Sequence, residues 1–119
     1  MSETAHPSHV KAGHFFGIEV RSIAITKDFR ADLQGMKNAI DSNTVCIIAS
    51  APEYAWGNYD PINEIAALAQ SKGIGCHCDC CLGSFINPFT KPLGYSVPYT
   101  FDFTVPGITS ISADPHKYA

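Results

Sequence analysis

Short apolar runs alternate along the chain with segments of helical periodicity. Runs of apolar or alternating residues predict strands, and they occupy 17–25, 45–49, 74–80 and 107–112. Apolar residues spaced three and four apart predict helices, and they occupy 7–16, 32–40 and 61–71. The segments between them are expected to be loops, because they are rich in proline, glycine and polar residues; the longest are 50–60 and 85–106.

Local signals support the predicted helices. Pro7 suits a first helical turn, and Gly17 and Gly73 suit helix ends. The apolar stripes that we expect to face a core are Leu33, Met36, Lys37 and Ile40 in one helix and Ile62, Ile65, Ala66, Leu68 and Ala69 in the next. The β-branched run at 45–49 is typical of a strand buried on both faces, as in parallel sheets.

The order of these elements predicts an α/β fold. Strand, helix, strand, helix and strand imply right-handed crossovers and a mostly parallel sheet with flanking helices. Such a sheet needs cover on both faces, and the predicted helices leave some faces and edges bare. The chain also stops two residues after Lys117, which belongs to the motif with the most specific chemical signal. We therefore expect an incomplete domain.

Composition narrows the class of protein. The 119 residues make one domain at most, with 45% hydrophobic and 16% charged residues. A net charge of -3 gives no electrostatic reason to expect nucleic acid or an anionic membrane as a partner. No apolar run reaches the roughly 20 residues that span a bilayer. The polar first ten residues lack the pattern of a signal peptide, so we expect a cytoplasmic protein.

Four of the five cysteines lie close together, at 76, 78, 80 and 81. On a strand, Cys76, Cys78 and Cys80 share one face, while His77 and Asp79 share the other. Zinc ligands are usually supplied from loops with wider spacing, so we favour reduced thiols that fill a sheet core and expect no metal. A small thiol-rich metal-binding module remains the alternative.

Asp79 and Lys117 each follow a predicted strand, at the edge where open α/β sheets bind ligands. A lysine can form a Schiff base with pyridoxal 5'-phosphate (PLP), and a carboxylate can keep the ring nitrogen of that cofactor protonated. One aspartate and one lysine also fit a plainer interpretation, in which an exposed lysine lies near a carboxylate that caps a loop.

Longer motifs resemble a known family. Cys76-His-Cys-Asp-Cys-Cys-Leu-Gly-Ser-Phe and Ile111-Ser-Ala-Asp-Pro-His-Lys-Tyr are similar to a strand and to the cofactor-lysine motif of the sphingosine-1-phosphate lyase branch of the group II PLP-dependent decarboxylases. Thr4-Ala-His-Pro-Ser-His-Val-Lys-Ala-Gly-His-Phe-Phe-Gly and Phe101-Asp-Phe-Thr-Val-Pro-Gly-Ile-Thr-Ser match further segments in family order. Cys78 and Cys80 depart from the residues that are common there, but both are small and apolar enough to fit.

The resemblance implies a role for each candidate residue. Lys117 would bind PLP covalently, Asp79 would pair with the ring nitrogen, and His6 would lie over the ring and act in catalysis with Lys117. His116 would sit beside the cofactor phosphate or the lysine linkage, and His77 would support the same strand end. The remaining histidines, His9 and His14, match no family role and are expected on a helix surface.

The resemblance also implies an architecture and an activity. Residues 1–119 would form part of the large PLP-binding domain of the aspartate-aminotransferase-like fold, without the phosphate loop that precedes it and the small C-terminal domain. The family acts on small-molecule amines as homodimers. The activity implied is carbon–carbon cleavage of a phosphorylated long-chain amino alcohol to an aldehyde and phosphoethanolamine. The alternatives are amino-acid decarboxylation and a truncated, non-catalytic remnant, and we expect the 119-residue chain alone to be inactive.

Overall fold

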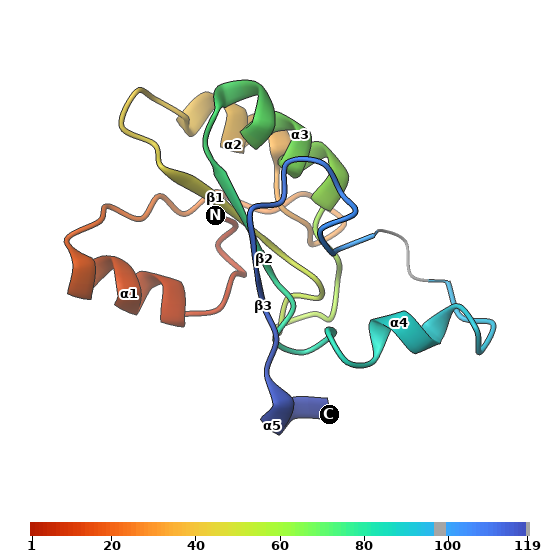
Figure 1. The fold of residues 1–119 in the computed structure, drawn as a ribbon. Helices are drawn as coiled ribbons and strands as arrows, with labels where there is room; N and C mark the ends of the chain where they lie inside the picture. Colours follow the sequence, from red (N-terminus) through yellow and green to blue (C-terminus); the bar gives the residue numbers. More distant parts are fainter. Residues whose placement is uncertain (97–99, 119) are drawn as a thin grey trace.

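A three-stranded parallel sheet organises the molecule (Figure 1). The structure is a computed structural model that describes residues 1–96 and 100–118. The strands are β1 (Cys46–Ser50), β2 (Gly75–Asp79) and β3 (Ser110–Ser112), in the order β1-β2-β3. Ser50 is paired with Asp79, and Asp79 with Ser112, so the three strands end side by side. This confirms the predicted parallel α/β sheet.

Helices lie against both faces of the sheet (Figure 1). The helices of the described residues are α1 (Ser8–Phe16), α2 (Leu33–Ala39), α3 (Ile62–Lys72), α4 (Asn87–Thr90) and α5 (Pro115–Tyr118). Helices α4 and α5 lie beyond the ends of the strands (Figure 1). The crossover helix α3 packs on β1 and β2, and α2 packs on α3. Helix α1 meets the other face, where His9 contacts the side chains of His77 and Asp79.

The predicted helix ends agree with the structure. Helix α1 follows Pro7 and ends at Gly17, whose φ of 65° is left-handed. Helix α3 ends in the same way at Gly73, with a φ of 66°. The Asp32 side chain caps α2 by accepting a hydrogen bond from the backbone N–H of Gln34 (3.0 Å).

The core lies between α3 and the sheet. Ile62, Ile65, Ala66 and Ala69 of α3 are fully buried, as are Cys76, Cys78 and Cys80. All five cysteines are free thiols. The predicted division of β2 is confirmed, since its cysteines enter the core while His77 and Asp79 face α1.

The strand predicted at 17–25 is wrong. This segment makes only two isolated bridges, Ser2 with Ile23 and Ile25 with Ala31. The backbone of Ile23 is bonded to that of Met1 and Glu3, so the segment pairs with the first residues of the chain and does not join the sheet. Its alternating apolar residues fit the pattern of a strand, but the pattern does not show which segment of the chain a strand pairs with.

Other differences are smaller. Strand β3 starts three residues later than predicted. The chain first turns through Gly107, whose φ is 98°, and the turn is closed by the backbone N–H of Ile108 bonding to the carbonyl of Val105 (3.3 Å). Lys37, expected in the apolar stripe of α2, is exposed, whereas Met36 is buried. The loop predicted at 85–106 contains the short helix α4, and its residues 97–99 lie outside the described residues.

Nothing in the described part of the chain has the form of a membrane-spanning helix, since each helix is too short or too polar to cross a bilayer.

Gly107 provides a test of how the chain turns into β3. A Cβ atom there would lie 2.3 Å from the carbonyl oxygen of Ala66, and the residue also has a positive φ. We expect Gly107→Ala to lower the free energy of unfolding by about 2–4 kcal/mol, measured by urea titration. Gly94→Ala is the control, because Gly94 has a φ of 83° with open space around it. It should cost only about 1 kcal/mol, and equal losses in the two variants would contradict the packing described.

Candidate active site

Because the three strands end at the same position in the register, polar side chains meet at one edge of the sheet, beside a cavity of about 290 Å³. Three of the residues predicted from the sequence line this cavity, namely His6, Asp79 and Lys117. The other lining residues are Ser8, Ser50, Pro52, Glu53, Tyr54, Cys81, Leu82 and Asp114. The cavity thus joins the N-terminal approach to α1, the ends of β1 and β2, and α5.

Asp79 is a firmly held carboxylate in this cavity. Its Oδ1 accepts hydrogen bonds from the backbone N–H of Cys81 (3.1 Å) and the hydroxyl of Ser112 (3.0 Å). Its Oδ2 lies 3.1 Å from Nε2 of His9. Burial of the carboxyl alone would raise its pKa, but the hydrogen bonds from His9, Cys81 and Ser112 outweigh burial and hold the pKa of Asp79 well below its usual range. The group is therefore a carboxylate at any ordinary pH.

Lys117 reaches the cavity from the short helix α5, which follows β3 directly. The first turn after the strand is closed by a bond from the backbone N–H of Lys117 to the carbonyl of Asp114 (3.0 Å). The lysine is exposed. An exposed amine on the rim of a cavity that contains a fixed carboxylate can attack a carbonyl carbon of a ligand bound there.

His6 also lines the cavity and lies just before α1 in the chain. Its Nδ1 lies 2.9 Å from the hydroxyl of Ser8. Its ring meets that of Tyr54 edge to face, with 5.3 Å between the centroids. These two aromatic rings give the cavity a wall suited to a flat ligand.

Two predicted residues do not line the cavity. His77 contacts the hydroxyl of Ser110 (2.9 Å) and the ring of His9, and burial, followed by the neighbouring His9, lowers its pKa. His116 is exposed and lies 3.6 Å from the carboxylate of Asp114. Because Asp114 itself lines the cavity, His116 can reach the site only through that carboxylate.

Sequence reasoning missed His9. The prediction that His9 and His14 lie on a helix surface is right for His14, which is exposed, and wrong for His9, which contacts Asp79. No local signal marked His9, because its contact with Asp79 depends on how α1 packs across the sheet. Tyr54 and Ser50 carried no signal either, since both belong to a segment read as a loop.

Ser50 indicates that the cavity accommodates a polar ligand. Its hydroxyl is buried and has no hydrogen-bond partner in the described part of the chain. Buried hydroxyls are normally paired, and this one lines the cavity next to Asp79 in the register of the sheet. A fixed carboxylate, a free amine and an unpaired hydroxyl therefore face the same small space, which is a donor and acceptor set that fits PLP.

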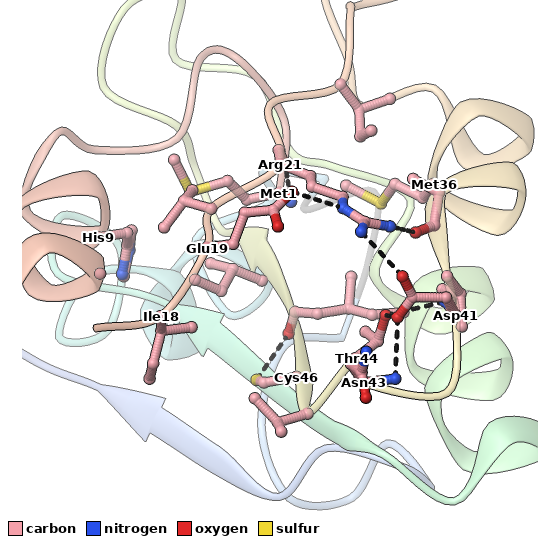
Figure 2. A pocket seen from close by; sticks show the side chains of 18 of the residues that line it. Met1, His9, Ile18, Glu19, Arg21, Met36, Asp41, Asn43, Thr44 and Cys46 are labelled. Atoms are coloured by element: carbon pink, nitrogen blue, oxygen red, sulfur yellow. Dashed lines mark hydrogen bonds and ion pairs between the residues drawn. The ribbon is translucent and has the colours of Figure 1, made fainter. Parts of the chain in front are cut away.

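A second, larger cavity of about 520 Å³ lies between α1, α2 and β1 (Figure 2). Its walls are mostly apolar, and its most prominent charge, Arg21, is already paired with Asp41 (2.8 Å) and Glu19 (3.0 Å). His9 lies on its wall (Figure 2). Because Lys117 and Asp79 line the smaller cavity, we place the candidate site there.

No metal site accompanies these groups within residues 1–96 and 100–118. No three His, Cys, Asp or Glu side chains gather there in a way that could hold a metal ion.

Comparison with known proteins shows the family of the chain. The pyridoxal-dependent decarboxylase conserved domain matches residues 1–119. The sphingosine-1-phosphate lyase of Oryza sativa is 46% identical over 118 residues, which cover 99% of this chain and 22% of that protein. A probable L-tyrosine/L-aspartate decarboxylase of Methanosarcina barkeri is 39% identical over 97% of this chain and 28% of its own length.

The fold agrees as well. The solved structure of a sphingosine-1-phosphate lyase from Burkholderia pseudomallei superposes with a TM-score of 0.94 at 41% identity, covering 98% of this chain and 27% of that one. The chain thus spans about a fifth to a quarter of the length of these relatives. The domain match extends over every residue, and the chain belongs to the pyridoxal-dependent decarboxylase family.

Proposed function

We propose that this chain forms part of a PLP-dependent carbon–carbon lyase of the sphingosine-1-phosphate lyase type, with Lys117 as the cofactor lysine. The observation that carries the proposal is the cavity in which Lys117 and the ionised Asp79 lie together. The lyases of Oryza sativa and Burkholderia pseudomallei, similar over nearly the whole chain, support it.

Each cavity residue has a distinct task in this proposal. Lys117 is the covalent attachment point, and Asp79 pairs with the ring nitrogen and keeps it protonated. His6 and Tyr54 supply the aromatic wall, and the Ser50 hydroxyl donates to a polar group of the ligand. Bound PLP supplies an aldehyde for the lysine and a ring that accepts the electron pair left by bond cleavage.

His116 and His77 act indirectly, through residues that they contact. His116 orients Asp114 through their contact of 3.6 Å. His77, bonded to Ser110, fixes β2 against β3 next to the site. The wider proposal comprises a large PLP-binding domain of the aspartate-aminotransferase-like fold over residues 1–119, a homodimer and a cytoplasmic location.

The choice of reaction rests on the degree of similarity. Identity is 46% to the lyase from Oryza sativa and 39% to the decarboxylase from Methanosarcina barkeri. This difference favours cleavage of a phosphorylated long-chain amino alcohol to an aldehyde and phosphoethanolamine. Decarboxylation of an amino acid is the second candidate, because it uses the same lysine and carboxylate. A non-catalytic remnant is the remaining alternative, and cofactor capture tests it.

Cofactor capture tests the proposed role of Lys117. The protein is incubated with PLP, reduced with borohydride and digested, and the pyridoxyl group is located by mass spectrometry. We expect the group on Lys117, since this lysine shares a cavity with Asp79. Lys117→Ala should abolish the specific labelling, whereas Lys91→Ala, at an exposed lysine outside the cavity, should leave it unchanged. Labelling scattered over the surface lysines would contradict the proposal.

A second prediction concerns the partner of the ring nitrogen. Asp79→Asn keeps the shape of the side chain but removes the charge that pairs with a protonated ring. We expect about a tenfold loss of PLP affinity, as is typical of a hydrogen bond to a charged group, measured by fluorescence titration. Asp28→Asn, at an exposed carboxylate that is not part of the cavity lining, is the matched control. Equal PLP affinities of the two variants would show that Asp79 does not contact the cofactor.

A further inference from the structure

His9 makes a contact that the proposed reaction does not yet explain. Its Nε2 lies 3.1 Å from Oδ2 of Asp79, and the side chains are only 17% and 9% exposed. The residues are 70 positions apart, in the first turn of α1 and at the last position of β2. The contact therefore ties the helix on one face of the sheet to the carboxylate at the sheet edge.

The three hydrogen bonds to Asp79 differ in origin. Those to Oδ1 come from Cys81 and Ser112, which follow or belong to the strands of the sheet. The bond to Oδ2 comes from His9, on a helix that packs on the sheet from outside. The Cys81 thiol also interacts with this carboxylate. With Oδ1 doubly bonded, His9 decides how the carboxylate is turned toward the cavity.

The proton on this contact can be placed. Asp79 is ionised, because the pKa of its carboxyl lies well below the usual range. The carboxylate is therefore an acceptor, and Nε2 of His9 must carry the proton. The ring of His77 lies 5.8 Å from that of His9 between centroids, and its Nδ1 contacts the hydroxyl of Ser110.

We propose that His9 is a positioning residue, whose ring donates to Asp79 and holds the carboxylate in the orientation in which it meets the cofactor ring. The role of His9 toward the cofactor rests on the proposed function. The contact between His9 and Asp79 rests on geometry alone. The other ionisable groups that line the cavity are His6, Glu53, Tyr54, Cys81, Asp114 and Lys117, and those on β2 are Cys76, His77 and Cys78.

The test is the titration of Asp79 without cofactor. Its side-chain carboxyl carbon is followed by NMR against pH in the wild type, His9→Phe and His9→Gln. In His9→Phe the pKa of Asp79 should rise by about one pH unit, because the bond to Oδ2 is lost. In His9→Gln, whose amide can still donate, part of that rise should be reversed. His14→Phe, on the exposed side of the same helix, should change nothing.

The same variants are then tested for cofactor capture at Lys117. Under the proposal, His9→Phe lowers the affinity for PLP about tenfold and His9→Gln less, while the fold, followed by amide NMR, is retained. An unchanged Asp79 pKa in His9→Phe would overturn the inference, whatever the cofactor does. Failure of the wild type to capture PLP, with the pKa of Asp79 still dependent on His9, would instead reject the proposed function and leave the His9–Asp79 pair established.

Discussion

The parallel pairing of the three strands is the constraint on which the rest of the structure depends. Because Ser50, Asp79 and Ser112 are aligned by the register, the polar residues at the strand ends are brought together before any specific contact is made. The crossover helix α3 buries its apolar side on the cysteines of β2 and thereby fixes that register. The face left free by α3 then presents Asp79 to α1, and the site forms between them.

The charge of Asp79 is set by the groups that this arrangement places around it. Burial by itself favours the neutral acid, but the hydrogen bonds from His9, Cys81 and Ser112 favour the carboxylate and prevail. A pKa that is lower in the folded than in the unfolded chain stabilises the fold above the unfolded value of about 3.9 and ceases to do so as the pH falls through the folded value. The site and the fold therefore share the same ionised group, and strong acid weakens both.

The sequence predicted what depends on local pattern. The helices around Met36 and Ile65, the glycine at the end of α1, and the alternation of cysteines with His77 and Asp79 on β2 follow from spacing alone. Pairing partners do not follow from spacing, which is why residues 17–25 had the pattern of a strand and yet pair with the first residues of the chain and with Ala31, outside the sheet.

The candidate site was predictable to a similar extent. Asp79, Lys117 and His6 could be chosen from motifs and strand ends, and all three line the cavity. His9 could not be assigned, because its contact depends on how α1 packs across the sheet. Conversely, His77 and His116 lie next to the right residues in sequence but outside the cavity lining. His77 is two residues back from the end of β2, where it contacts Ser110, and His116 is on an exposed turn.

The central claim is that Asp79 holds the ring nitrogen of PLP protonated in this cavity. The direct measurement is the ¹⁵N chemical shift of PLP labelled at the ring nitrogen and bound to the protein at neutral pH. The account predicts the shift of a protonated pyridinium, which moves toward the neutral value in Asp79→Asn. A neutral ring nitrogen in the wild type, or a protonated one that is indifferent to Asp79→Asn, would contradict it.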